Sequence, residues 1–213
     1  TGSVACPACE SLRSVGVDDR HLHTDAPATL DLSPYRTAWA EDRLSDVVDD
    51  CKSDLRAYVR KRGFVDGGAL RPLDDTVLAA HELLQVMDLF GRTRDPSDAD
   101  ERYLLALLRG ADEGERPPPE AVSSAWAEAR GLAYANAVDD YRRDVLEWLD
   151  DHPDPEARRT LGTIRERVKR IEALQGDVSP AEAESLVRAT REVGRYLMEG
   201  EEASLAAARE RLQ

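Results

Sequence analysis

Residues 134–149 read YANAVDDYRRDVLEWL. Apolar side chains recur there at every third or fourth position, which places them along one stripe of an α-helix. The stripe consists of Tyr134, Ala137, Val138, Tyr141, Val145, Trp148 and Leu149. It predicts a helix from about Glu120 to Asp151, in which Gly131 is expected to cause a kink or a division. Segments with the same periodicity lie on both sides, so the predicted fold is an all-α multi-helix bundle.

The other helical segments are bounded by capping residues, proline and glycine. Ser33-Pro34 opens a first long helix that is expected to continue to Gly63, because Ser favours the N-cap and Pro the first turn. Further helices are expected at residues 74–91, 97–110, 155–174 and 179–200, with loops at 64–72 and 111–119 and a short helical tail at 201–213. The pattern amounts to about six helices.

The N-terminal residues differ from the rest of the chain. Residues 1–24 contain the motif Cys6-Pro7-Ala8-Cys9 and short stretches compatible with β-strands. Residues 25–33 have the composition of a linker, since Pro27 disfavours helix in the residue before it. The predicted organisation is a short β-type unit at 1–24, a linker at 25–33 and a helical bundle at 34–213.

Composition restricts the class of protein. No apolar run approaches the roughly 20 residues that a membrane-spanning helix needs, and the start of the chain does not resemble a signal peptide. Three cysteines, two of them in one CxxC motif, fit metal binding in a reducing compartment better than a disulfide framework. We therefore expect a cytoplasmic protein without a membrane anchor.

The charge distribution is unusual. The 213 residues include 43 Asp and Glu against 29 Lys and Arg, a formal charge of −14, and the only lysines are Lys52, Lys61 and Lys169. This composition resembles that of proteins from extremely halophilic archaea. Molar salt shortens the Debye length to about 3 Å and screens the repulsion within such a surface. The acidity therefore indicates adaptation to a solvent rather than a particular partner.

The CxxC motif is the strongest chemical signal. Two thiolates at this spacing on a tight turn can bind one cation, and Zn²⁺ favours tetrahedral thiolate coordination. Residues 1–12, TGSVACPACESL, resemble the second knuckle of a zinc ribbon of the transcription-factor-B type. The resemblance implies that Cys6 and Cys9 are zinc ligands and that a first knuckle, which this chain is expected to lack, lies upstream. The whole chain resembles uncharacterised zinc-ribbon proteins of halophilic archaea.

Two other interpretations of the motif remain open. His21 and His23 follow at a spacing that can complete a Cys2His2 zinc site, because alternate residues of a strand lie on one face. A redox-active CxxC ranks lower, since no long amphipathic helix follows Cys9.

Two isolated residues receive structural interpretations. Cys51 lies on the apolar stripe of the first helix and is expected to be a small buried hydrophobic residue. The sequence from His81 to Gln85, HELLQ, nearly matches the HExxH motif of zinc proteases, but Gln85 replaces the second histidine ligand. We therefore expect His81 at the surface or at its boundary.

Paired aspartates suggest an alternative function. Asp46 and Asp50, like Asp140 and Asp144, are four positions apart and share one helix face, with Asp139 beside the second pair. Such carboxylates can hold Mg²⁺ against a diphosphate. A helical Mg²⁺-dependent enzyme would require the two pairs to converge on one cavity. In so acidic a chain the spacing also arises by chance, and Arg142 and Arg143 suggest ordinary helix-face pairing.

Two groups of basic residues are candidates for contact with nucleic-acid phosphate or with an acidic partner protein. The larger group is Arg158, Arg159, Arg165, Arg167, Lys169 and Arg170, and the smaller is Arg56, Arg60, Lys61 and Arg62. The structural alternative for both is stabilisation of a helix C-terminus by cations.

Phosphate-binding glycine loops and the GxSxG motif are absent from the sequence. The sequence therefore favours a non-enzymatic protein in which a zinc ribbon is joined to a helical bundle that binds protein or nucleic acid. Zinc is the expected cofactor, and no membrane partner is expected.

Overall fold

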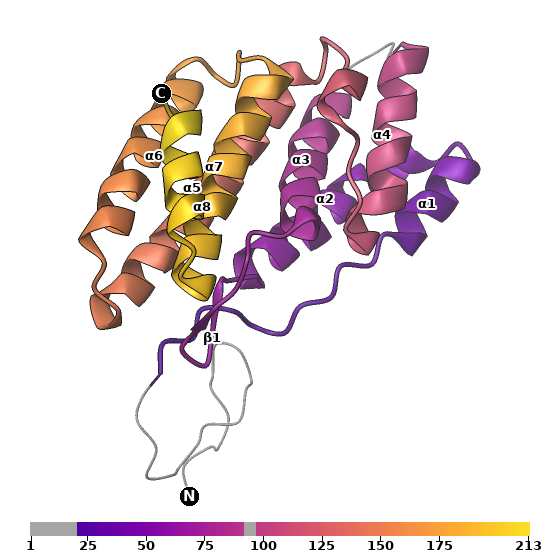
Figure 1. Cartoon of the computed structure of the whole chain (residues 1–213). Coiled ribbons are helices and arrows are strands. Elements are labelled where there is room, and N and C mark those ends of the chain that lie inside the picture. The colour runs from indigo at the N-terminus through magenta and orange to yellow at the C-terminus, as the bar shows by residue number, and fades with distance from the viewer. Residues whose placement is uncertain (1–20, 92–96) are drawn as a thin grey trace, which may run out of the picture.

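The structure of the chain, a computed structural model, describes residues 21–91 and 97–213. Its helices are α1 (Ser33–Ala40), α2 (Leu44–Lys61), α3 (Asp75–Phe90), α4 (Asp98–Gly110), α5 (Ala127–Asp151), α6 (Pro155–Ala173), α7 (Pro180–Glu199) and α8 (Glu202–Arg211). Strands β1 (Val65–Asp66) and β2 (Ala69–Leu70) form a hairpin, and 3₁₀ turns lie at Ala111–Glu113 and Pro119–Ala121. The predicted all-α multi-helix class is confirmed (Figure 1). None of the helices described here has the length and apolar character to cross a bilayer.

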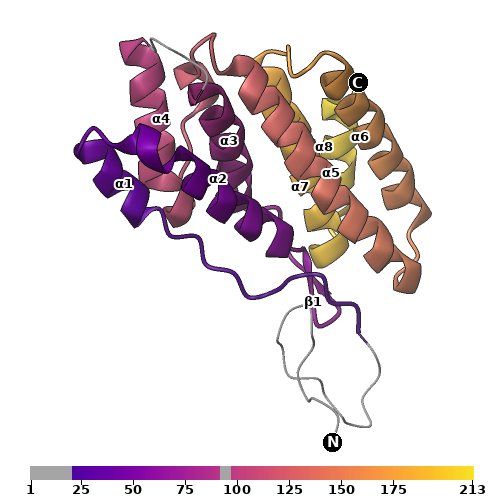
Figure 2. The same ribbon diagram turned by 180° about the vertical axis from the view of Figure 1, so that it is seen from behind.

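Helices α3 and α5 form the centre of the bundle. Helix α3 packs against α2, α4 and α5, whereas α5 also packs against α6 and α7. Seen from behind, α2 and α5 lie on the two sides of α3 (Figure 2). Both central helices contribute fully buried side chains, including Leu78 and Leu83 from α3 and Val138 and Val145 from α5. Their apolar stripes therefore form the core that the periodicity predicted.

Side-chain caps begin several helices where the sequence predicted them. The Ser179 hydroxyl accepts a hydrogen bond from the Glu182 backbone amide, and Asp154 accepts from the amides of Glu156 and Ala157. These bonds satisfy amide donors that the first turn of a helix leaves unpaired. Local chemistry thus fixes the starts of α6 and α7.

The predicted first long helix is divided in the structure. A turn at residues 41–43, where Asp42 has φ of 54°, separates α1 from α2. Helix α1 folds back beside α2, and the Tyr35 hydroxyl donates a 2.5 Å hydrogen bond to Asp54 of α2. The predicted first helix is therefore two helices, and the predicted helical tail is a further helix, α8. Together they account for the eight helices in the described part of the chain, where about six were predicted.

Gly131 does not divide α5, and that part of the prediction is wrong. The helix is continuous from Ala127 to Asp151, while residues 122–126 before it are not α-helical. A Cβ atom at Gly131 would overlap the carbonyl oxygen of Gly176 in the turn before α7. Glycine is therefore required at this position for close packing between two segments.

The predicted loop at 64–72 contains the β-hairpin. Gly67 and Gly68 form its turn with φ of 57° and 85°, conformations that glycine adopts without a steric cost. The segment at residues 22–26 lies along this hairpin, since the Gly68 amide donates to the Leu22 carbonyl and the Thr24 amide donates to the Val65 carbonyl.

The residues predicted as a linker, 25–33, lie against the bundle. The Leu32 side chain is fully buried, and Leu30 is 9 % exposed. Leu32 is also held by its backbone amide, which donates a 3.0 Å hydrogen bond to Asp112. This segment is therefore part of the packed unit in the structure.

Candidate functional site: a groove between α2 and α5

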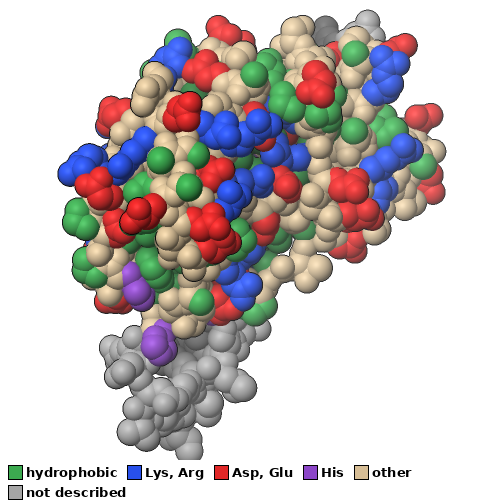
Figure 3. Space-filling view, viewed as in Figure 1, with side chains coloured by type: hydrophobic (Ala, Val, Ile, Leu, Met, Phe, Trp, Pro, Cys, Tyr) green, Lys and Arg blue, Asp and Glu red, His purple; other side chains and the backbone are tan. Residues whose placement is uncertain are grey.

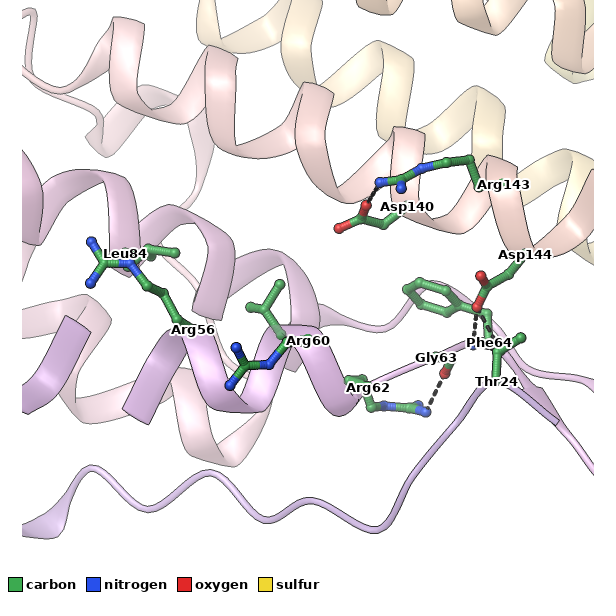
Figure 4. Close-up of a pocket in the computed structure, with 11 residues that line it drawn as sticks. Thr24, Arg56, Arg60, Arg62, Gly63, Phe64, Leu84, Asp140, Arg143 and Asp144 are labelled. Carbon is green, nitrogen blue, oxygen red and sulfur yellow. Dashed lines mark hydrogen bonds and ion pairs between the residues drawn. The ribbon is translucent and has the colours of Figure 1, made fainter. Parts of the chain in front are cut away.

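A surface groove of about 370 Å³ lies where α2 and α5 both pack on α3 (Figure 4). Helix α2 contributes one wall, helix α5 contributes the other, and Leu84 of α3 lies between them. The lining residues are Thr24, Arg56, Val59, Arg60, Arg62, Gly63, Phe64, Leu84, Asp140, Arg143 and Asp144. Both charge signs and apolar side chains are therefore present in one groove.

The hairpin end of the groove is closed by hydrogen bonds to Asp144. Its Oδ2 atom accepts from the Thr24 hydroxyl at 2.6 Å and from the Phe64 backbone amide at 2.8 Å. A Cβ atom at Gly63 would collide with the Thr24 backbone, so glycine permits this close approach. The Phe64 ring packs edge-on against Tyr141 at 4.9 Å. The segment that follows the N-terminal motif is thereby fixed to α5.

The α5 wall contains a partly buried carboxyl group. Asp140 forms an ion pair with Arg143, and burial nevertheless raises the pKa of Asp140 above its usual value. His81 of α3 lies behind it, with 3.6 Å between His81 Nε2 and Asp140 Oδ2. His81 is only 6 % exposed, and this burial lowers its pKa to about 4. The prediction that His81 lies at the surface or at its boundary is wrong, because that position of α3 is covered by packing against α5.

The α2 wall contains the cations without partners. Arg56 and Arg60 are exposed, one helical turn apart, and neither has an ion pair or a hydrogen bond among the residues that the structure describes (Figure 4). Arg62, by contrast, pairs with Asp25 at 2.6 Å and with Asp74 at 2.9 Å. Within the described chain, two guanidinium groups without a partner therefore lie on the α2 side of the groove, and the carboxylates on its α5 side are already bonded.

The two aspartate pairs do not converge. Asp140 and Asp144 line the groove, but Asp46 and Asp50 are exposed on α2 and are not among its lining residues. The groove carboxylates are bonded to Arg143, Thr24 and Phe64. In residues 21–91 and 97–213, no group of three or more His, Cys, Asp or Glu side chains is arranged to hold a metal ion. The arrangement required by a paired-aspartate enzyme is therefore not present in this region.

The larger basic group is mostly paired. Arg158 and Lys169 form ion pairs with Asp150 at 2.7 Å and with Glu166 at 2.9 Å. Arg159 pairs with Glu156, Arg170 pairs with Glu182, and Arg167 donates to the carbonyls of Leu212 and Gln213. Only Arg165 of this group is exposed and has no partner in the described part of the chain. Acidic and basic side chains are correspondingly interspersed on the face that Figure 3 shows.

The proposed zinc ligands Cys6 and Cys9 lie outside the described residues. The alternative zinc ligands, His21 and His23, lie beside the hairpin, and both side chains are exposed. His23 Nδ1 lies 3.2 Å from the Gly67 amide nitrogen and 3.2 Å from Asp66 Oδ1. A Cβ atom at Gly68 of the same turn would lie 3.1 Å from His21 Nδ1. The two rings thus flank the hairpin turn at the point where the described chain begins.

Cys51 is fully buried, as the sequence predicted. Burial raises the pKa of its thiol to about 12, so the thiolate is disfavoured at neutral pH. This cysteine is a packing residue of α2, and it provides an unreactive internal reference for experiments on Cys6 and Cys9.

The sequence pointed to the charged residues of the groove one group at a time, but it did not indicate that they lie together in one groove. The spacing of Arg56 and Arg60 by four positions was the available signal, since it places both on one helix face. Thr24, Phe64 and Leu84 gave no such signal. They join the groove only through the hairpin and the packing of α3.

Fold and site together define a helical-bundle protein with a groove of mixed charge on its surface. The chain belongs to the Family of unknown function (DUF7117), whose model matches residues 1–212. Comparisons with curated proteins and with solved structures gave no match. The family match spans the Cys6-Pro7-Ala8-Cys9 motif as well as the bundle, so one family model covers both parts of the chain.

Proposed function

We propose that this chain is a non-enzymatic interaction protein, in which a zinc ribbon is attached to a helical scaffold that binds protein or nucleic acid. The observation that carries the proposal is the pairing of the charged side chains that line the groove. Its carboxylates, Asp140 and Asp144, are bonded internally, whereas its cations Arg56 and Arg60 have no partner in the described chain. Such a groove is suited to binding a ligand by charge and shape rather than to holding a catalytic metal ion.

The zinc part of the proposal rests on Cys6 and Cys9, two thiolates at the spacing of a zinc knuckle. It is supported by the anchoring of the segment that follows them. Thr24 is bonded to Asp144 of α5, and Leu22 is bonded to the hairpin. A metal-bound unit at the Cys6-Pro7-Ala8-Cys9 motif would therefore be attached to the bundle through the bonded residues Leu22 and Thr24.

Two further properties accompany the proposal. A cytoplasmic location is consistent with the chemistry, because zinc-binding thiols must remain reduced. Adaptation to high salt is consistent with the net charge of −14 and with the use of Arg in place of Lys. Salt of high concentration would screen the repulsion within this surface.

Zinc per chain, measured by elemental analysis of the natural full-length protein, tests the proposal. We expect one tightly held zinc ion, lost in the double variant Cys6→Ser/Cys9→Ser and retained in Cys51→Ser, which removes the buried thiol. Loss of zinc in His21→Ala/His23→Ala would identify the Cys2His2 alternative. A protein that holds no zinc, or that keeps it without Cys6 and Cys9, would refute the zinc-ribbon assignment.

A further inference from the structure

We infer that the groove between α2 and α5 binds an acidic segment of a partner protein, whose carboxylates pair with Arg56 and Arg60. The inference deepens the proposed function and rests on its claim that the bundle is a binding surface. It does not depend on zinc. A test of the groove can therefore fail or succeed separately from a test of the metal site.

The first argument is the charge balance of the α2 wall. In a chain with a formal charge of −14, basic side chains have abundant carboxylates nearby, and most basic residues of α6 are paired. Arg56 and Arg60 remain unpaired within the described chain, although both line a groove. A guanidinium group can form bidentate hydrogen bonds with a carboxylate, so Arg56 and Arg60 together can bind two acidic side chains.

The spacing of the two arginines specifies the ligand further. Residues four apart on a helix lie about 6 Å from one another at their Cβ atoms. Two carboxylates one helical turn apart on a partner match this separation. The partner segment is therefore expected to be helical, with acidic residues at positions i and i+4.

The apolar lining adds a second requirement. Val59 and Leu84 are half-buried in the groove beside the arginines, and the buried Phe64 closes one end. Apolar side chains of a partner helix would gain contact there and exclude water from the ion pairs. A purely acidic segment would leave this surface unused, so an amphipathic acidic helix fits the groove better.

Nucleic acid fits the groove less well. A nucleic-acid backbone carries a charge at every phosphate, so phosphates beyond those paired with Arg56 and Arg60 would meet Asp140 and Asp144, whereas an amphipathic helix can direct apolar side chains there. The net charge of −14 repels a polyanion more strongly than it repels a short segment with two carboxylates. The aromatic ring that lines the groove, Phe64, is 1 % exposed and so offers no surface for base stacking.

A labelled amphipathic helical peptide, with Glu at i and i+4 beside a leucine stripe, is the probe. Its binding is measured by fluorescence anisotropy at the lowest salt concentration at which circular dichroism shows the chain folded. We expect saturable binding to the unaltered protein and a loss of at least about tenfold in Arg56→Glu/Arg60→Glu. Both side chains are exposed and unpaired in the described chain, so this variant is expected to fold normally.

The matched control is Arg165→Glu, which reverses an exposed, unpaired arginine on α6 outside the groove. It should bind the peptide as the unaltered protein does. A peptide with Lys in place of the Glu pair should bind Arg56→Glu/Arg60→Glu better than it binds the unaltered protein. Binding of the Lys peptide to this variant would show that the charged pair of the peptide contacts residues 56 and 60.

The inference is overturned if the peptide shows no saturable binding, or if Arg165→Glu weakens binding as much as the groove variant. It is also overturned if a single-stranded or duplex oligonucleotide, rather than the peptide, binds in a manner that requires Arg56 and Arg60. Cys6→Ser/Cys9→Ser should bind the peptide normally. Loss of zinc and loss of peptide binding are thereby distinguished.

Discussion

The Arg130 guanidinium of α5 and the Glu82 carboxylate of α3 form an ion pair of 2.7 Å, and neither side chain is exposed to solvent. The Tyr134 hydroxyl donates a 3.0 Å hydrogen bond to the second Glu82 oxygen, and the Tyr103 hydroxyl donates to the first. Arg130 also donates to the Pro117 carbonyl at 2.6 Å. The two central helices are therefore joined by a buried polar network.

Removal of one partner of this pair should destabilise the protein strongly. Glu82→Leu leaves the Arg130 charge buried without a carboxylate, and Arg130→Met leaves the Glu82 carboxylate without a cation. For each single variant we expect a loss of about 3–5 kcal/mol in the free energy of unfolding. The double variant Glu82→Leu/Arg130→Met should lose much less than the sum of the single changes. Urea unfolding of the four proteins in this double-mutant cycle measures the coupling. Additive losses would contradict a direct interaction between the two charges.

The pH dependence of stability should contain a contribution from His81. Its pKa is lowered by burial to about 4, whereas the unfolded chain has a pKa of about 6.5 at this residue. Between these values the unfolded state binds more protons than the folded state. The stabilising contribution of the neutral His81 ring is therefore complete above pH 6.5 and decreases as the pH falls toward 4. The slope is at most about 1.4 kcal/mol per pH unit.

The Asp140 carboxyl faces His81 and opposes this effect, because burial raises its pKa. The informative quantity is therefore the difference between the unaltered protein and His81→Gln, which lacks the titrating ring. Its free energy of unfolding, measured by urea at pH 7 and pH 5, should decrease less on acidification than that of the unaltered protein. Parallel pH profiles would show that His81 is not buried as a neutral ring.

Two glycines should respond to alanine in opposite directions. A Cβ atom at Gly131 would overlap the Gly176 carbonyl, so Gly131→Ala should destabilise by about 1–3 kcal/mol. Gly162 is exposed on α6 with open space around it, and Gly162→Ala should stabilise by about 0.5–1 kcal/mol through helix propensity. Urea unfolding of both variants provides the comparison. A gain of stability in Gly131→Ala would contradict its assignment to close packing, and a loss in Gly162→Ala would contradict the open space around Gly162.

The Tyr141 hydroxyl is buried against α7 and has no hydrogen-bond partner among the residues described. Tyr141→Phe removes this unsatisfied group and should be neutral or stabilise by up to about 1 kcal/mol. A Cβ atom at Gly194 would overlap the same hydroxyl, so Gly194→Ala should be destabilising alone but tolerated together with Tyr141→Phe. Thermal unfolding of the single and double variants measures this coupling. Equal effects of Gly194→Ala with and without the hydroxyl would argue against the contact.

The sequence by itself determined the helical character of the chain and several of its boundaries. Periodic apolar positions specify one face of a helix regardless of what covers it, and Asp154 and Ser179 satisfy amides within a few residues of themselves. These interactions are local, so they can be recognised without knowledge of the fold. The burial of Cys51 followed from the same periodicity.

Pairs such as Asp140 with Arg143 lie within one helical turn, but tertiary structure decided which charges are buried and which are bonded across elements. Asp46 and Asp140 each precede another aspartate by four positions, yet the first is exposed and the second lies against α3 in the groove. The turn before α2, the burial of His81 and the close packing at Gly131 depend equally on segments distant in the chain. Pairing between side chains is set by the three-dimensional distances that folding creates, and helical periodicity specifies the face of a residue but not the partner that meets it.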